Sequence, residues 1–357
     1  MKINNQFDTF EKIEQLIVCD EEKVLLRDIE KKFPTRITSN YLAQIDWGDM
    51  KDPIRKMCIP TIAELDNEGS LDTSGEETYT VCHGLQHKYR ETALVLFTNE
   101  CATYCRYCFR RRFVGTNKEE VINDEEEVIN YISDHKEINN VLVSGGDPLT
   151  SDTTHLLGFV EKLCEIDSLN FIRIGTKVPI VYPQRIIDDQ ELLKGLKSCS
   201  LKKQIYIVIQ CNSINELSKE AIMAIQEMQK NGLIFRSQTV LLKGVNDNKE
   251  ELVKLFNKLV SIGVIPYYIF QCRPVKGICE EFQVPLREGN KIINEVKTAL
   301  NGIAKDFKYC MSTVQGKIEI VGEYNNEMIF RYHESPVVEN VGKVISMNIR
   351  KDQSWIV

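Results

Sequence analysis

The segment Cys101-Ala-Thr-Tyr-Cys105-Arg-Tyr-Cys108 places three cysteines within eight residues, directly after a short apolar, β-branched run at 93–98. Three thiolates on so short a loop can bind three irons of a cubane cluster. Because no fourth cysteine lies nearby, one iron would keep an open coordination position. The spacing therefore predicts a [4Fe–4S] cluster on Cys101, Cys105 and Cys108.

The open iron gives this motif its chemical meaning. It can be chelated by the amino and carboxylate groups of S-adenosylmethionine, and one electron from the cluster then releases a 5′-deoxyadenosyl radical. A structural zinc site would need a fourth ligand, and the nearest upstream histidine, His87, lies on the other side of a predicted strand. An electron-transfer cluster normally has four cysteines. The motif favours radical chemistry, with zinc and electron transfer as alternatives.

From residue 93 onward, short apolar runs alternate with stretches of helical period. The predicted helices span 119–133, 152–164, 187–196, 214–230, 250–262 and 288–300. Six strand–helix units in series indicate a parallel sheet with right-handed crossovers, too few for a closed eight-stranded barrel. We expect an α/β fold, a partial (β/α)6 barrel of the radical S-adenosylmethionine type. The predicted strands span 93–98, 140–144, 171–175, 204–210, 233–242 and 267–271.

The chain divides into three predicted segments. Residues 1–92 are expected to form a helical N-terminal extension, in which 67–77 is an exposed acidic connector. Residues 93–303 form the partial barrel. Residues 304–357 form a small C-terminal segment with strands at 307–312, 317–321 and 328–332 and a turn at Asn325-Asn326.

A glycine-rich turn follows the second predicted strand, in Ser144-Gly145-Gly146-Asp147-Pro148. Two glycines let the backbone approach a ligand closely, and the carboxylate can accept hydrogen bonds from the ammonium group of S-adenosylmethionine. In such sheets the chemistry collects at the C-terminal ends of the strands. The alternative is a plain turn. Its position one strand after the cysteines favours Gly145, Gly146 and Asp147 as cofactor-binding residues.

The composition of the chain limits which classes of binding partner are expected. The net charge of −7 argues against a nucleic-acid binder, which usually presents a basic surface. No apolar run approaches the roughly 18 residues that span a bilayer, and the first fifteen residues lack the apolar region of a signal peptide. A cytoplasmic protein is expected. The twelve cysteines are then metal ligands or buried apolar residues rather than disulfides.

The chain resembles the lysine 2,3-aminomutase family of radical S-adenosylmethionine enzymes over roughly residues 33–331. The resemblance implies movement of an amino group between adjacent carbons of a small amino acid, with pyridoxal phosphate as a second cofactor. It also implies an external electron donor such as a flavodoxin or ferredoxin, and it leaves open a homo-oligomer. The matching stretches are Asp52-Pro53, Gly84–Tyr89, Cys105–Phe113, Ser144–Asp147, Arg173–Gly175, Pro183–Ile186, Gly244–Asp247 and Pro266–Tyr268.

Three residues take roles from this resemblance, and a fourth is a candidate from its position at a strand end. Lys317 falls at the position of the lysine that binds pyridoxal phosphate, and Arg110 matches the arginine that pairs with the substrate α-carboxylate. Gln238 matches a glutamine of the S-adenosylmethionine site, and Asn212 ends the fourth predicted strand facing the same mouth. The alternatives are a surface lysine, a basic loop edge and ordinary polar residues at strand ends.

The chain also departs from the family pattern near the cofactor phosphate. Where the family has two arginines, this sequence has Lys88 and Thr92, so one of the two charges is kept. Arg90 or Arg273 is a candidate for the missing cation. The glycine-rich run before the cofactor lysine is reduced to Thr313-Val314-Gln315-Gly316.

A second departure concerns the substrate. Two aspartates that hold the distal ammonium of lysine correspond here to Arg273 and Cys310. An arginine would repel a lysine side chain, so free lysine is not the expected substrate. An acidic or neutral amino acid, or a phosphate contacted by Arg273, fits better. Two further functions stay open: a radical isomerase or modifying enzyme without pyridoxal phosphate, and an iron–sulfur electron-transfer protein.

Overall fold

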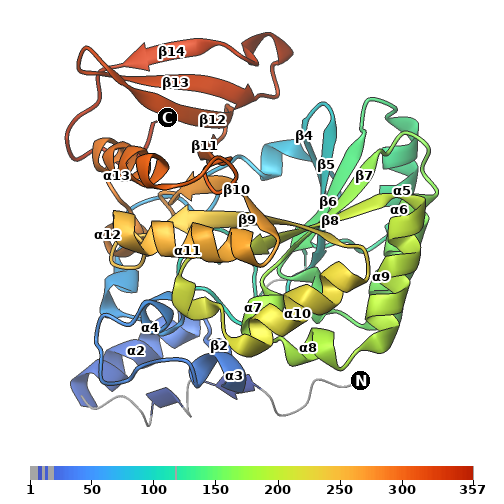
Figure 1. The fold of residues 1–357 in the computed structure, drawn as a ribbon, viewed down its shortest axis with the longest axis horizontal. Helices are drawn as coiled ribbons and strands as arrows, with labels where there is room; N and C mark the ends of the chain where they lie inside the picture. The colour runs from blue at the N-terminus through green and yellow to red at the C-terminus, as the bar shows by residue number, and fades with distance from the viewer. Residues whose placement is uncertain (1–6, 10–12, 15–19, 117–118, 357) are drawn as a thin grey trace.

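The computed structural model describes residues 7–9, 13–14, 20–116 and 119–356. Residues 1–6, part of the stretch expected to lack a targeting signal, lie outside the described residues. Within the described part, no helix is long and apolar enough to cross a membrane. Figure 1 shows a curved sheet flanked by helices, with the N-terminal segment at one end and the last strands at the other.

The centre of the fold is a run of six parallel strands, each hydrogen-bonded to the next. Apolar, mostly β-branched residues fill these strands, as expected where both faces of a parallel sheet are covered. The sheet is α/β and mostly parallel, which confirms the predicted fold class. The strands are β5 (Thr92–Thr98), β6 (Asn140–Gly145), β7 (Phe171–Thr176), β8 (Gln204–Gln210), β9 (Ile234–Leu241) and β10 (Val264–Gln271).

Helices fill the connections between these strands, as predicted. Each long helix turns an apolar face toward the sheet, and the buried faces join one core cluster that also includes residues of both terminal segments. The connecting helices are α5 (Glu125–Asp134), α6 (Thr153–Cys164), α7 (Val178–Val181), α8 (Gln184–Ile187), α9 (Gln190–Lys202), α10 (Lys219–Lys230) and α11 (Lys249–Ser261). Two further helices, α12 (Cys279–Phe282) and α13 (Leu286–Ala299), follow β10.

Three predicted helices begin later than expected because a capping residue interrupts each one. The carboxylate of Asp124 accepts hydrogen bonds from two backbone N–H groups, so α5 begins at Glu125 rather than at residue 119. Asp189 caps α9 in the same way, which separates it from the short α8. Ser218 caps α10 and divides the helix expected at 214–230 into a 3-10 turn, Ile214–Glu216, and α10.

The sheet continues past both edges of the barrel. On one side β4 (Leu85–Tyr89) and β3 (Thr80–Cys82) add antiparallel strands to β5. On the other, β11 (Lys308–Thr313) pairs in parallel with β10 and is followed by antiparallel strands. These are β12 (Gly316–Tyr324), β13 (Glu327–Glu334) and β14 (Val344–Met347). The three-segment division therefore stays a prediction, and β14 was not foreseen.

The N-terminal segment is not purely helical, contrary to expectation. Besides β3 and β4 it holds the small pair β1 (Phe7–Thr9) and β2 (Arg36–Thr38). Because β4 pairs with β5 and β3 pairs with β4, the backbone groups at the β5 edge of the sheet are hydrogen-bonded. Its helices are α2 (Asp20–Lys32), α3 (Ser39–Leu42) and α4 (Pro53–Cys58), with 3-10 turns at Ile62–Leu65 and Glu77–Tyr79.

The turn at Asn325-Asn326 matches its prediction, whereas the connector at 67–77 does so only in part. Asn325 and Asn326 have φ of 49° and 64°, so the predicted tight turn between β12 and β13 is confirmed. The connector at 67–77 is not wholly exposed, because Ser74 and Glu76 are buried. Ser70 N donates to the Pro274 carbonyl at 3.0 Å, which ties this connector to the loop after β10.

Candidate active site

A cavity of about 340 Å³ opens where the parallel strands end, and it brings together most of the predicted site residues. Its walls also include residues from β4, β11, β12 and β13. Asn212 and Cys310 are not among the lining residues. The predicted residues that do line it are Lys88, Cys101, Cys105, Cys108, Arg110, Gly145, Gly146, Asp147, Gln238, Arg273 and Lys317.

The cysteine loop is anchored to the N-terminal segment by a buried carboxylate. Glu64 accepts hydrogen bonds from Arg106 Nε at 2.8 Å and Nη2 at 2.6 Å, and it also pairs with Arg111. Arg106 N donates to the Met57 carbonyl at 2.9 Å. Burial opposes ionisation of Glu64, but the two guanidiniums outweigh it and lower the pKa of this carboxyl. The loop therefore has a rigid base.

Replacing Glu64 with glutamine should destabilise the protein by about 3–5 kcal/mol, because two buried guanidiniums lose their anion. Anaerobic thermal unfolding of the cluster-loaded protein should show a Tm lower by roughly 5 °C. Since the folded pKa of Glu64 is lowered, this contribution is present above the unfolded pKa of about 4 and is lost as the pH falls through the folded value. Equal stability at neutral pH would contradict the anchoring role.

The matched control for this substitution is Glu165→Gln, which removes an exposed carboxylate paired with Lys202 at 2.6 Å. Exposed ion pairs contribute little because water screens them. We expect no measurable shift in Tm.

The three cysteines are half-buried, and each of them lines the cavity. Burial raises the pKa of Cys108 to about 11, so the free thiol holds its proton at neutral pH and iron must displace it. Among the described residues, no three His, Cys, Asp or Glu side chains converge on a single metal ion. Ligands of a cubane need not converge, because each binds a different iron. The donor set fits a cluster.

The glycine turn after β6 is held in place by Asp147. Its carboxylate accepts from Thr176 Oγ1 at 2.7 Å, from Lys177 N at 2.6 Å and from the backbone of Val178 and Leu149 at 3.1 Å each. These donors occupy both oxygens, so the structure gives Asp147 a role in shaping the turn. At Gly146 a Cβ would collide with the Glu100 carbonyl oxygen, which explains the glycine.

The two predicted strand-end residues differ in position. Gln238 lies on β9 and lines the cavity. Asn212 is fully buried behind the wall, where its Oδ1 accepts from Val240 N at 2.8 Å. Cys310, which replaces an aspartate of the family pattern, is also fully buried, and burial raises its pKa to about 12. The structure does not bring these last two side chains into the cavity.

Lys317 lines the cavity from β12, and its Nζ lies near two tyrosine rings. Its Nζ lies 2.5 Å from Glu334 Oε2, 4.5 Å from the centre of the Tyr268 ring and 5.7 Å from that of Tyr89. Tyr268 Oη is 2.7 Å from His333 Nε2, which fixes the ring. An amine, a carboxylate and apolar ring faces thus meet at one wall.

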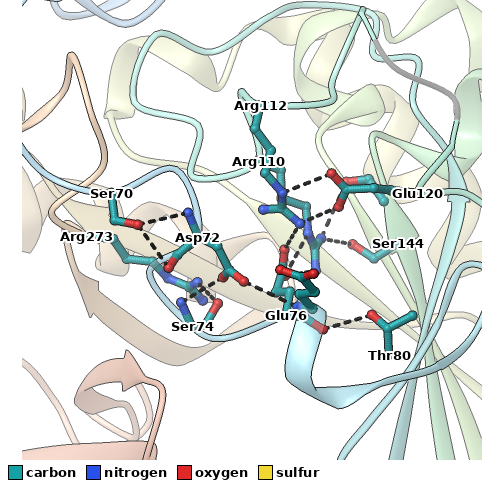
Figure 2. A network of polar contacts seen from close by, with 12 residues as sticks. Ser70, Asp72, Ser74, Glu76, Thr80, Arg110, Arg112, Glu120, Ser144 and Arg273 are labelled. Atoms are coloured by element: carbon teal, nitrogen blue, oxygen red, sulfur yellow. Dashed lines mark hydrogen bonds and ion pairs between the residues drawn. The ribbon is translucent and has the colours of Figure 1, made fainter. Parts of the chain in front are cut away.

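Arg110 is already paired within the protein. Figure 2 shows Arg110 and Arg112 converging on Glu76, at 3.2 Å and 2.6 Å. Arg110 Nη1 also donates to Ser144 Oγ at 3.1 Å. Burial opposes ionisation of Glu76, but the arginines dominate and lower the pKa of the carboxyl. A substrate carboxylate at Arg110 would have to share this guanidinium with Glu76.

In the described part of the chain, Arg273 and Lys88 donate hydrogen bonds only to neutral groups. Arg273 Nη1 donates to Ser74 Oγ at 2.6 Å, as Figure 2 shows, and its guanidinium stacks 3.8 Å from the Phe109 ring. Lys88 Nζ donates to the Ser74 and Thr313 carbonyls. Burial lowers the pKa of Arg273 to about 10; burial and the charge of Arg273 lower that of Lys88 to about 8.

Positive charge exceeds negative charge at this cavity. Among the described lining residues, six side chains are lysine or arginine and three are carboxylates. Lys88, Arg173 and Arg273 have no carboxylate within ion-pair distance in that part of the chain. Arg173 Nε is also buried without a hydrogen-bond partner. Half-buried cations without a carboxylate partner are suited to anionic ligands.

Comparison with known proteins then decides the family. A provisionally named L-lysine 2,3-aminomutase from Aquifex aeolicus (strain VF5) is 40% identical over 340 residues, which is 95% of this chain and 91% of the relative. The chain belongs to the lysine 2,3-aminomutase family. L-lysine 2,3-aminomutase from Clostridium subterminale is 33% identical over 97% of this chain and 82% of its own length.

Two further findings describe this member of the lysine 2,3-aminomutase family. The family model for the radical SAM superfamily matches residues 95–256, which include the cysteine loop and strands β6 to β9. Glutamate 2,3-aminomutase from Clostridioides difficile (strain 630) is 34% identical over 83% of this chain and 69% of its own length. The family consists of radical S-adenosylmethionine isomerases, and it implies a [4Fe–4S] cluster and S-adenosylmethionine as cofactors.

Sequence reasoning missed several residues of this aminomutase-family cavity. Lys177 lies two residues after the third predicted strand, so the strand-end rule would have found it. Arg173 lies within that same strand, where its charge was a signal. Glu76 was hidden in a connector taken as exposed, and Glu334 ends an antiparallel strand to which that rule does not apply.

Proposed function

We propose that this protein is a radical S-adenosylmethionine amino-acid 2,3-aminomutase that uses pyridoxal phosphate on Lys317 and acts on an acidic amino acid rather than on lysine. The observation that carries the proposal is a shared cavity: Lys317 and the three cysteines, far apart in sequence, line the same space. A radical formed at one wall would meet a substrate held at the other without crossing water.

In this proposal Cys101, Cys105 and Cys108 hold the cluster, and Gly145, Gly146 and Gln238 border the bound S-adenosylmethionine. When bound, these cofactors supply a carbon radical that removes a hydrogen from the substrate. Asp147 keeps the turn in shape through its four backbone and hydroxyl donors. The electron would come from an external donor, for which we propose a flavodoxin or ferredoxin.

Pyridoxal phosphate fits the opposite wall. The cofactor requires an amine, an apolar surface for its ring and cations for its phosphate. Lys317 offers the amine and Tyr89 offers ring surface, while Lys88 and Arg173, whose Nε has no hydrogen-bond partner, offer the cations. Bound there, it would supply the electron-delocalising ring that lets an amino group move between adjacent carbons. Glu334 holds the Lys317 amine in position.

Two guanidiniums of the cavity that are not assigned to the cofactor phosphate, Arg110 and Arg273, support an acidic substrate. Arg110 is proposed to bind the substrate α-carboxylate, as one of the guanidiniums at this cavity. Arg273 stacks on Phe109 with no carboxylate partner in the described part of the chain, so a second substrate carboxylate can pair with it. The ammonium of a lysine substrate would instead meet this guanidinium.

Replacing Arg273 with aspartate should reverse the charge preference of the cavity. We expect the ratio of kcat/KM for glutamate to that for lysine to fall at least about 100-fold, because one partner of a desolvated ion pair becomes repulsive. Lys276→Asp changes the same charge on the same loop outside the lining residues and should leave the ratio unchanged. A wild-type preference for lysine would contradict the proposal.

Phosphate binding should depend on the charge of Lys88. The pKa of Lys88 is about 8 without a ligand. A bound anion raises that pKa, so above pH 8 binding is accompanied by protonation of the Lys88 amine. Affinity for pyridoxamine phosphate, which lacks the aldehyde, should fall up to about tenfold per pH unit above pH 8. Calorimetry on Lys88→Met should show weaker binding without this slope. The same slope in Lys88→Met would argue against this assignment.

A direct assay tests the whole proposal. The reconstituted protein is incubated anaerobically with S-adenosylmethionine, a strong reductant, pyridoxal phosphate and glutamate, and nuclear magnetic resonance detects the β-amino product. We expect product only when all components are present. 5′-Deoxyadenosine formed at the same rate with and without pyridoxal phosphate, and no β-amino product in either case, would instead indicate a radical enzyme of another kind.

A further inference from the structure

Lys177 connects the two loops that border the predicted cluster. Its backbone N–H donates to Asp147 Oδ2 at 2.6 Å, which ties it to the glycine turn. Its Nζ lies 3.3 Å from Tyr107 Oη, and Tyr107 stands between Cys105 and Cys108 in the cysteine loop. The ammonium also forms an ion pair with Glu216. Lys177 is thus fixed beside the cysteines at several points.

Glu216 is held as firmly as its partner. The side chain is fully buried and accepts from Asn212 N and Tyr41 Oη, each at 2.6 Å, and from Ser213 N at 3.2 Å. Lys177 itself is 7% exposed. Neither charge can swing away to solvent. Opposite charges in such a place act on their surroundings with little screening.

The two residues of the ion pair differ in their position relative to the cavity. Lys177 lines it together with Cys105, whereas Glu216 is not among the lining residues. The Lys177 ammonium contacts both Glu216 and, through the Tyr107 hydroxyl at 3.3 Å, the cysteine loop. A cluster on these cysteines would therefore face the positive end of a buried ion pair.

We infer that the Lys177–Glu216 pair sets the reduction potential of the cluster. Reduction adds one electron from the external donor and makes the cluster more negative by one charge, without forming or breaking a bond. A fixed ammonium stabilises the reduced form, and the carboxylate behind it limits that stabilisation. Lys177 is a positioning residue. This inference rests on the cluster of the proposed function and is independent of pyridoxal phosphate.

The test is a redox titration of the reconstituted cluster, followed by electron paramagnetic resonance, in the full-length protein without S-adenosylmethionine. At a fixed potential, Lys177→Met should lower the ratio of reduced to oxidised cluster about tenfold, which corresponds to ~59 mV for a one-electron couple. Glu216→Gln should raise the ratio. Opposite shifts identify an electrostatic effect, because a general loosening of the loop has no reason to change sign between partners.

Three controls make the result decisive. Lys177→Arg keeps the charge and should keep the ratio within about threefold of wild type, since a charge change alone is expected to give the larger shift. Lys202→Met and Glu165→Gln, which break an exposed pair, should change nothing. Shifts of the same sign in the Lys177→Met and Glu216→Gln proteins, or no shift in either, would overturn the inference.

Where Glu216→Gln does not assemble a cluster, the comparison of Lys177→Met with Lys177→Arg decides. Equal ratios in these two variants would show that charge is not the determinant and would overturn the inference. A wild-type protein that took up no iron under reducing, anaerobic conditions would overturn the proposed function itself.

Discussion

Replacing Cys105 with alanine is expected to abolish the reductive cleavage of S-adenosylmethionine. Cys105 is the middle ligand of the predicted set, and its loop is anchored to the N-terminal segment through Arg106 and Glu64. With only two thiolates left, the cubane loses a third of its protein ligands and the geometry that leaves a single iron open. The measurement is 5′-deoxyadenosine formed anaerobically under strong reductant, together with iron content.

Cys82→Ala provides the matched control for the cysteine substitution. Cys82 is half-buried at the end of β3 and is not among the residues that line the cavity. Its removal should leave cleavage at the wild-type level. Retained cleavage in the Cys105→Ala protein would show that the cluster is bound elsewhere. A wild-type protein with an intact cluster but no cleavage would favour electron transfer.

Replacing Lys317 with alanine is expected to eliminate both the covalent attachment of pyridoxal phosphate and the formation of a β-amino acid. The Lys317 Nζ is the amine at the wall that includes Tyr89 and Glu334, and alanine leaves no nucleophile there. The cysteine loop is untouched, so slow cleavage of S-adenosylmethionine should persist. Borohydride reduction followed by peptide mass analysis identifies the modified residue.

Lys343→Ala is the control for the lysine substitution. Lys343 is exposed next to β14 and does not line the cavity. It should keep attachment and turnover unchanged. Full turnover in the Lys317→Ala protein, or mass labelling at another lysine of the wild type, would contradict the cofactor assignment and favour a radical enzyme without pyridoxal phosphate.

The core of the fold could be predicted because its strands are buried on both faces. Runs such as 204–210 and 140–144 are short, apolar and β-branched, and they alternate with helical stretches. Helix starts were less predictable, because a single capping side chain such as Asp189 sets them. The extra strands at both edges were missed in part because β14 depends on pairing with β13.

The cysteines and the glycine turn could be placed because they follow predicted parallel strands, whereas Lys317 was placed by the family resemblance. The cysteines, the glycine turn and Lys317 all line the cavity as expected. Asn212 was misplaced because a residue at a strand end can satisfy a neighbouring backbone N–H instead of facing the mouth. Glu76 was missed because acidic connectors are usually solvated, and only its pairing with Arg110 and Arg112 buries it.

The anaerobic visible spectrum of the reconstituted protein, recorded with and without pyridoxal phosphate, is the most direct test of a radical aminomutase. We expect an iron–sulfur absorbance that bleaches on reduction and is lost in Cys105→Ala, because Cys105 is a proposed ligand. We also expect a separate pyridoxal absorbance that is lost in Lys317→Ala. A wild-type protein that holds the cluster but shows no pyridoxal absorbance would contradict the proposed function.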